Sequence, residues 1–153
     1  MSCPFADIVS GMNFSTGIDI DAATDRVWSV MTDVERWHEW TASITSVRRL
    51  DSGPFGSGAR VRVKQPRLAP QNWIVTDWQQ GRSFTWVTSG PGLRVTATHA
   101  VQPTSSGSRV NLSLRFEGVL GVVLARLFRS LTTRYMQMEA EGLKHRSERH
   151  TAR

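Results

Sequence analysis

The sequence predicts an α+β fold that combines an antiparallel β-sheet with a long C-terminal α-helix. Three patterns support this prediction. Segments in which apolar and polar residues alternate recur through the middle of the 153-residue chain, two short helical segments follow the first of them, and an amphipathic segment covers Gly118–Lys144. Runs of strands bounded by helices are typical of α+β domains, and strands with one apolar face form a sheet with one wet side.

The first strand and the two short helices are predicted before residue 41. Apolar and polar residues alternate over Met12–Ile20, which predicts a strand. Asp21 can cap a short helix that we expect from about Ala22 to Asp33. A second short turn or helix is expected over Glu35–Trp40.

Six further strands are expected, because each segment has one apolar face and is followed by Gly, Pro or other turn residues. In these strands the apolar side chains are expected to face inward and the basic ones to face water. The expected strands are Ile44–Leu50, Ala59–Lys64, Asn72–Gln79, Ser83–Thr88, Leu93–Val101 and Val110–Phe116.

The C-terminal segment Gly118–Lys144 is predicted to be one continuous amphipathic helix. Its apolar residues recur every three or four positions, which places them on one helical face. The residues of this stripe are Leu120, Leu124, Leu127, Leu131, Tyr135 and Met138. A helix of this length can lie across a small sheet, at roughly 1.5 Å per residue. If the sheet curls around this helix, the two enclose a cavity.

Composition and charge give weaker expectations. The formal net charge is +6 and the pI is about 10.9, which favours anionic partners or an arginine-rich solvated surface. The single cysteine, Cys3, excludes an intrachain disulfide, and no secretory signal is recognised, so we expect a cytoplasmic protein. We expect one domain over 1–153, with an ordered core of about 12–144 and flexible tails at 1–11 and 145–153.

Several motifs resemble a known superfamily. They are I-x-I-D-A leading into D-R-V-W-S-V-M-T-D over Ile18–Asp33, W-x-x-W at Trp37 and Trp40, I-T-S-V at Ile44–Val47, G-x-R-V-R-V at Gly58–Val63, W-I-V-T-D-W at Trp73–Trp78, F-T-W-V at Phe84–Val87, T-H-A-V-Q-P at Thr98–Pro103 and S-R-V-N-L-S at Ser108–Ser113. The chain resembles the START-like, Bet v 1-like (SRPBCC) superfamily, and within it the polyketide cyclase/dehydrase-type proteins. The resemblance spans about Met12 to Lys144 and implies the helix-grip fold, in which a curved antiparallel β-sheet wraps around a long C-terminal α-helix. Because the superfamily includes lipid and hormone carriers as well as aromatic polyketide cyclases, it does not choose between binding and catalysis.

An aromatic-lined cavity with few polar groups is the expected site. His99 shares the inward face of its strand with Val95 and Ala97, and an imidazole there could bond a ligand or transfer a proton. Tyr135 is the second candidate for catalysis. The residues expected to line the cavity are Trp40, Trp73, Phe84, Trp86, Ala97, His99, Leu124, Phe128, Leu131 and Tyr135.

Three functions remain open at this point. The first is binding of a small hydrophobic molecule, lipid-like, aromatic or polyketide-like. The second is cyclisation and dehydration of a polyketide in the same cavity, with Arg62 or Arg94 involved only if the strand parity is reversed. The third is binding of nucleic acid by the basic outer face, where Trp78 is the aromatic of matching parity, and we rank it last. No metal spacing occurs, so we expect neither metal nor cofactor, and either a monomer or a homodimer.

Overall fold

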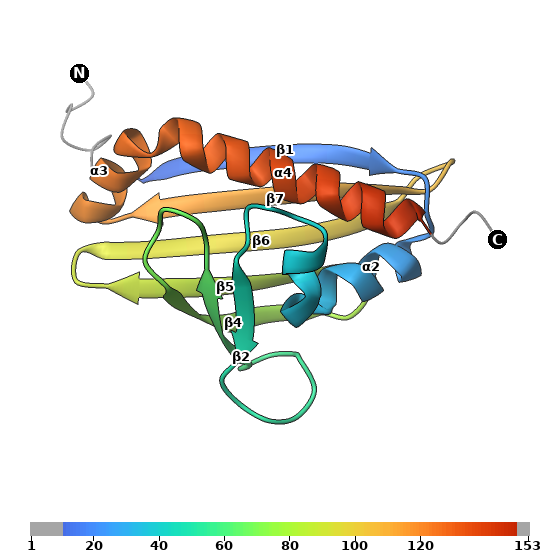
Figure 1. Cartoon of the computed structure of the whole chain (residues 1–153), viewed down its shortest axis with the longest axis horizontal. Coiled ribbons are helices and arrows are strands. Elements are labelled where there is room, and N and C mark those ends of the chain that lie inside the picture. The colour runs from blue at the N-terminus through green and yellow to red at the C-terminus, as the bar shows by residue number, and fades with distance from the viewer. Residues whose placement is uncertain (1–10, 150–153) are drawn as a thin grey trace, which may run out of the picture.

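Seven antiparallel strands form one curved sheet around the C-terminal helix in the computed structural model, which describes residues 11–149 (Figure 1). Within these residues the strand order across the sheet is β1-β7-β6-β5-β4-β3-β2. The predicted α+β class and helix-grip fold are confirmed. The strands are β1 Met12–Ile20, β2 Ser46–Arg49, β3 Arg60–Lys64, β4 Gln71–Gln79, β5 Ser83–Gly90, β6 Leu93–Pro103 and β7 Ser108–Glu117.

The helices close the concave side of this sheet. They are α2 Thr24–Thr32, the 3-10 helix η1 Val34–Glu39, α3 Val119–Leu127 and α4 Arg129–Glu148. Helices α2 and η1 lead the chain from one edge strand, β1, to the other, β2, and α4 crosses the sheet as Figure 1 shows. The indole Nε1 of buried Trp37 donates to the carbonyl of Met31 at 3.1 Å, which ties η1 to the end of α2.

The inner face of the sheet follows the alternation seen in the sequence. Val95, Ala97, His99 and Val101 of β6 are all buried, and the residues between them are less so. This alternation arises because successive strand residues point to opposite faces. The alternate residues of β6 thus face inward as predicted, and the imidazole of His99 is buried on the inner face of the sheet.

A β-bulge in β4 makes one predicted orientation wrong. The pairing of β4 with β5 is regular up to Val75 and shifts before Asp77. The extra residue reverses the parity of the rest of the strand, as bulges do. Trp78 therefore packs inward against Trp28, at 5.2 Å between ring centroids, and does not lie among the outer arginines.

The predicted continuous C-terminal helix is in fact two helices. The backbone leaves helical geometry at Phe128, with φ −104° and ψ 23°, and α3 and α4 take different directions there (Figure 1). The start of α3 is held separately, because the carbonyl of Gly92 accepts the N–H of Leu120 at 3.0 Å. Leu127, predicted to face inward, is 71% exposed because it lies on the outer side of α3. The last helix extends to Glu148, beyond the predicted end at Lys144.

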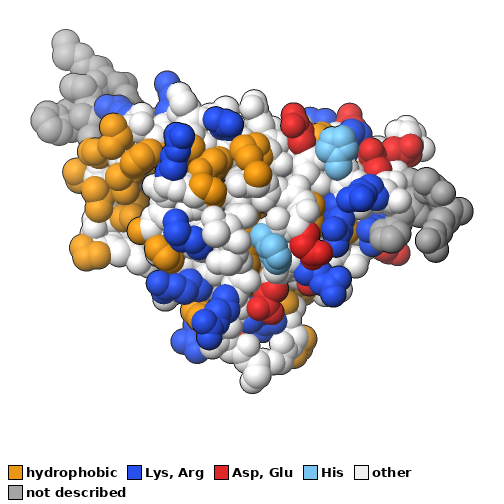
Figure 2. Space-filling model, in the orientation of Figure 1, with side chains coloured by type: hydrophobic (Ala, Val, Ile, Leu, Met, Phe, Trp, Pro, Cys, Tyr) orange, Lys and Arg blue, Asp and Glu red, His pale blue; other side chains and the backbone are white. Residues whose placement is uncertain are grey.

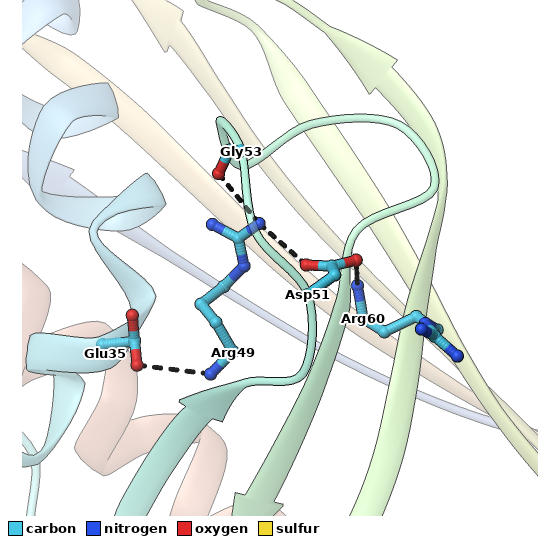
Figure 3. Close-up of polar contacts among 5 residues, drawn as sticks. All are labelled: Glu35, Arg49, Asp51, Gly53 and Arg60. Atoms are coloured by element: carbon cyan, nitrogen blue, oxygen red, sulfur yellow. Dashed lines mark hydrogen bonds and ion pairs between the residues drawn. The ribbon is translucent and has the colours of Figure 1, made fainter.

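The loop between β2 and β3 is held by a network of polar contacts (Figure 3). The Arg49 guanidinium donates to Asp51 Oδ1 at 2.9 Å and to the Gly53 carbonyl at 3.1 Å, and the backbone N–H of Arg60 donates to Asp51 Oδ2 at 2.9 Å. The bond from Arg49 is the main cause of a lowered pKa at Asp51. The loop carries Phe55, whose ring meets Trp78 edge-on at 5.5 Å and so closes one side of the aromatic core.

The expected tails are only partly within the described residues. Residues 1–10, with Cys3, and residues 150–153 lie outside them. Among residues 11–149, no helix is long and apolar enough to cross a membrane.

Candidate functional site

A cavity of about 420 Å³ lies between the concave face of the sheet and the two C-terminal helices. Its wall is mostly aliphatic and aromatic, with a few polar side chains. The sheet and η1 supply Trp37, Trp73, Trp86, Val95, Ala97, His99, Leu112 and Leu114, and the helices supply Leu124, Phe128, Leu131, Thr132, Tyr135, Met136 and Glu139. Cavities of about 300–1,000 Å³ with this composition commonly hold small molecules.

Tryptophan rings form a large part of one wall. Trp73 of β4 and Trp86 of β5 project from neighbouring strands, with ring centroids 5.8 Å apart. Trp37 of η1 lies 5.3 Å from Trp86 and brings a third ring to the same wall. Indole rings offer large apolar faces to flat ligands.

A pair formed by buried His99 and half-buried Glu139 is the main polar feature of the cavity. His99 Nε2 lies 3.2 Å from Glu139 Oε1, and the two side chains are only 6% and 17% exposed. The geometry lets Nε2–H donate to the carboxylate. The imidazole stacks on Phe84, with centroids 4.4 Å apart and planes inclined by 12°, and its Nδ1 has no hydrogen-bond partner within residues 11–149. The Glu139 carboxylate, held in this way at the cavity wall, can accept a hydrogen bond or a proton from a molecule in the cavity.

One rim of the cavity is the loop after β3. The ammonium of Lys64 donates to the carbonyls of Gln65 and Leu68, which folds the loop back on its own strand. The phenol of Tyr135 donates to the carbonyl of Pro66 at 2.6 Å and joins the loop to α4. Gln65, Arg67 and Leu68 of this loop line the cavity.

Eight of the ten residues predicted for the site line this cavity. They are Trp73, Trp86, Ala97, His99, Leu124, Phe128, Leu131 and Tyr135. The fully buried Phe84 lies behind His99 and supports the imidazole instead of lining the wall. Trp40 packs on Trp37 at 5.7 Å, and its place at the wall is taken by Trp37, because η1 turns that ring inward.

Sequence reasoning missed Trp37 and Glu139. Glu139 lies one helical turn beyond Tyr135, so the periodicity that placed Leu131 and Tyr135 on the inner face also places this carboxylate there. Trp37 was visible as the first residue of W-x-x-W, but only the path of η1 decides which ring points inward. The outward positions of Arg62 and Arg94 follow the predicted parity, so neither reaches the cavity.

The residues present are suited to an organic molecule. Within the part of the chain that the structure describes, no three His, Cys, Asp or Glu side chains gather in a group that could hold a metal ion. The cavity instead offers apolar rings and hydrogen-bonding groups, the pattern of sites for small organic molecules.

Solved structures of low sequence identity share this fold. A protein from Thermus thermophilus has a TM-score of 0.71 and 20% identity, and the match covers 89% of this chain and 97% of that chain. The Zhui aromatase/cyclase from Streptomyces sp. R1128 has a TM-score of 0.74 and 13% identity, with 92% and 96% covered. Norcoclaurine synthase from Thalictrum flavum has a TM-score of 0.74 and 12% identity, with 94% and 98% covered.

Sequence comparison identifies the family itself. No curated protein gives a significant match to the chain. The model of one protein family matches residues 12–148, which include all seven strands and all the helices described above. The chain therefore belongs to the polyketide cyclase/dehydrase and lipid transport family.

Proposed function

We propose that the protein binds a small hydrophobic molecule in the cavity between the sheet and helices α3 and α4. The observation that carries the proposal is the cavity of about 420 Å³, whose wall combines three tryptophan rings with aliphatic side chains. Burial of apolar ligand surface there would supply about 25 cal/mol per Å². Membership of a family described by polyketide chemistry and lipid transport supports the same ligand class.

The polar groups of the wall define the ligand further. The Glu139 carboxylate and the Tyr135 phenol lie on the same side of α4, while most of the opposite wall is apolar. A ligand with one hydroxyl or enol group at one end of an apolar or aromatic body would satisfy both surfaces. Lipid-like and polyketide-like molecules both fit this description.

Two measurements test the proposal: identification of a bound molecule, and the effect on its affinity of a larger side chain in the cavity. Native mass spectrometry of the protein purified from its host would identify a retained molecule, and quenching of Trp73 and Trp86 fluorescence would measure its affinity. Leu131→Trp places a larger ring in the cavity and should weaken binding by at least about tenfold. Thr133→Trp, on the exposed side of the same helix, is the matched control and should bind normally. Equal affinity of both variants would place the ligand elsewhere.

Acid–base catalysis in the same cavity is the second candidate function. The specific observation in its favour is the pair formed by His99 and Glu139, 3.2 Å apart at the cavity wall. In an aldol closure of a polyketide, Glu139 would take a proton from the carbon next to a carbonyl, the resulting carbanion would attack a second carbonyl, and the alkoxide so formed would take the proton back from Glu139. Loss of water would then need a base that removes a second proton from the same carbon and an acid that protonates the departing hydroxide, and Glu139 could serve in turn as both.

Substitutions of the pair separate catalysis from binding. Glu139→Gln keeps the size and the hydrogen-bonding capacity of the side chain but removes the base. Turnover of an unreduced polyketide surrogate should fall by roughly 10²–10⁴-fold, the usual contribution of a general base, while affinity changes little. Unchanged turnover in Glu139→Gln would exclude this role, and absence of turnover in the unsubstituted protein would leave ligand binding as the function.

A further inference from the structure

Helix α3 carries an apolar patch on its solvent side. The patch consists of Val119, Leu120, Val123 and Leu127, which are 71%, 44%, 53% and 71% exposed. At about 100° per residue these four fall within one arc of the helix. The opposite arc, with Gly121, Val122 and Ala125, is buried against the sheet. Figure 2 shows hydrophobic side chains gathered over α3. Contiguous exposed aliphatic residues of this kind mark interaction surfaces.

The charged side chains within the patch and after it as far as residue 138 are all positive. Over residues 119–138 the sequence contains three charged residues, Arg126, Arg129 and Arg134, and no acidic residue. All three are exposed, and none forms an ion pair within residues 11–149. Lys and Arg side chains lie beside the hydrophobic ones in Figure 2. A surface that offers an apolar phase and negative charge together would complement both features.

We infer that α3 docks the protein on the surface of an anionic lipid bilayer. The acyl boundary of a bilayer would take the four aliphatic side chains, and lipid phosphates would pair with Arg126 and Arg129, as in other interfacial amphipathic helices. A second copy of the chain fits less well, because a symmetric contact would bring the same unpaired arginines together. The patch thus matches a lipid surface in both polarity and charge.

The helix that carries the patch also forms part of the cavity wall. Leu124, on the flank of the same helix, and Phe128, at its end, line the cavity. A bilayer bound to the outer arc of α3 would therefore lie next to the cavity wall. A lipid-like ligand could then exchange between the bilayer and the cavity, a step that rests on the proposed function. Docking of α3 on the bilayer does not depend on the proposed function.

Vesicle flotation tests docking directly. The unsubstituted protein should float with vesicles made of equal parts phosphatidylcholine and phosphatidylglycerol, and poorly with phosphatidylcholine alone. Val123→Ser with Leu127→Ser removes apolar surface without changing charge and should lower the partition coefficient by about tenfold or more. The matched control is Leu50→Ser with Ile74→Ser, at apolar positions that are 39% and 42% exposed away from α3, and it should float normally.

The arginines are tested separately. Arg126→Gln with Arg129→Gln should lower partitioning onto the anionic vesicles by about fivefold per arginine and leave the weak binding to phosphatidylcholine unchanged. Docking is overturned if the unsubstituted protein does not float, if the serine variant floats equally well, or if sedimentation shows a dimer that the serine substitutions dissolve without any vesicle binding. Since cavity binding is measured by tryptophan quenching without vesicles, failure of docking leaves that result intact.

Discussion

Gly142 shows how one residue can fix the packing of two elements. It lies inside α4, where the carbonyl of Trp40 approaches so closely that an added Cβ would overlap it. The close approach fixes the end of η1 against the last helix. Glycine is a poor helix former, by about 1 kcal/mol relative to alanine, so its presence here reflects packing and not propensity.

Substitution of Gly142 by alanine should therefore destabilise the protein. The overlap involves a backbone atom that cannot rotate away, and overpacking of this kind costs about 1–3 kcal/mol, more than the gain in helix propensity. The free energy of unfolding from denaturant titration should fall in Gly142→Ala. Gln137→Ala, at an exposed position of the same helix, should leave it unchanged or raise it slightly. A more stable Gly142→Ala would mean that the two elements can separate at little cost.

Individual side chains also show which parts of the site the sequence could reveal. The alternation of polar and apolar residues is enough to predict that Ala97 and His99 point inward, because β6 is regular over its whole length. The same alternation gives the wrong orientation for Trp78, because the shift in pairing before Asp77 cannot be recognised in a pattern of polar and apolar residues. Glu139 was overlooked although its position on the helix was predictable, since a charged residue on an inner face becomes meaningful only when its partner His99 is known.

At the scale of elements, the loop from residue 65 to 70 depends on a contact with α4. The phenol of Tyr135 donates to the carbonyl of Pro66 across the cavity rim. Tyr135→Phe keeps the ring and removes this bond, which is worth about 0.5–1.5 kcal/mol. Hydrogen exchange at the amide of Leu68 should accelerate by the corresponding factor, about 2- to 13-fold, and a molecule held in the cavity should dissociate faster. Unchanged exchange would mean that the Lys64 contacts hold the loop by themselves.

The loop between β2 and β3 gives a prediction about pH. Asp51 accepts bonds from Arg49 and Arg60, and its pKa is lowered mainly by the bond from Arg49. A carboxylate with a lowered folded-state pKa stabilises the fold fully above the ordinary pKa of aspartate, ~3.9, and loses that effect as the pH falls through the lowered value. Asp51→Ala should therefore have a lower Tm than the unsubstituted protein at neutral pH, and the difference should vanish in strong acid.

An exposed aspartate is the control for this effect. Asp77 of β4 is exposed, and Asp77→Ala should leave the Tm nearly unchanged at every pH. A Tm difference for Asp51→Ala that persists in strong acid would show that the lost packing of the loop, and not the ionised carboxylate, is responsible.

The break at Phe128 is the element-scale feature that the sequence did not reveal. The apolar period continues through it, so one long helix was the reasonable prediction. The break depends on long-range contacts, because the carbonyl of Gly92 in the β5–β6 turn holds the start of α3 while α4 packs along β1. A local pattern carries no information about such a contact, whereas the strands and α2 follow from local patterns and were predicted within a few residues.

At the scale of the whole molecule, occupancy of the cavity should control stability. A ligand that binds only the folded state at a hundred times its Kd adds about 2.7 kcal/mol. For a domain of this size the Tm should then rise by roughly 5–10 °C. The molecule found by native mass spectrometry should produce this shift in the unsubstituted protein and little shift in Leu131→Trp. An equal shift in both would argue against the cavity as its site.

The order of strands has a consequence for how the chain assembles. Among residues 11–149, strand β1 pairs only with β7, from Met12 with Phe116 to Ile20 with Ser108. The backbone partners of β1 are thus synthesised only after strands β2 to β6, and contacts so distant in sequence slow folding because a large loop must close first. During translation β1 has to wait, with its apolar side chains uncovered, until almost the entire domain has left the ribosome.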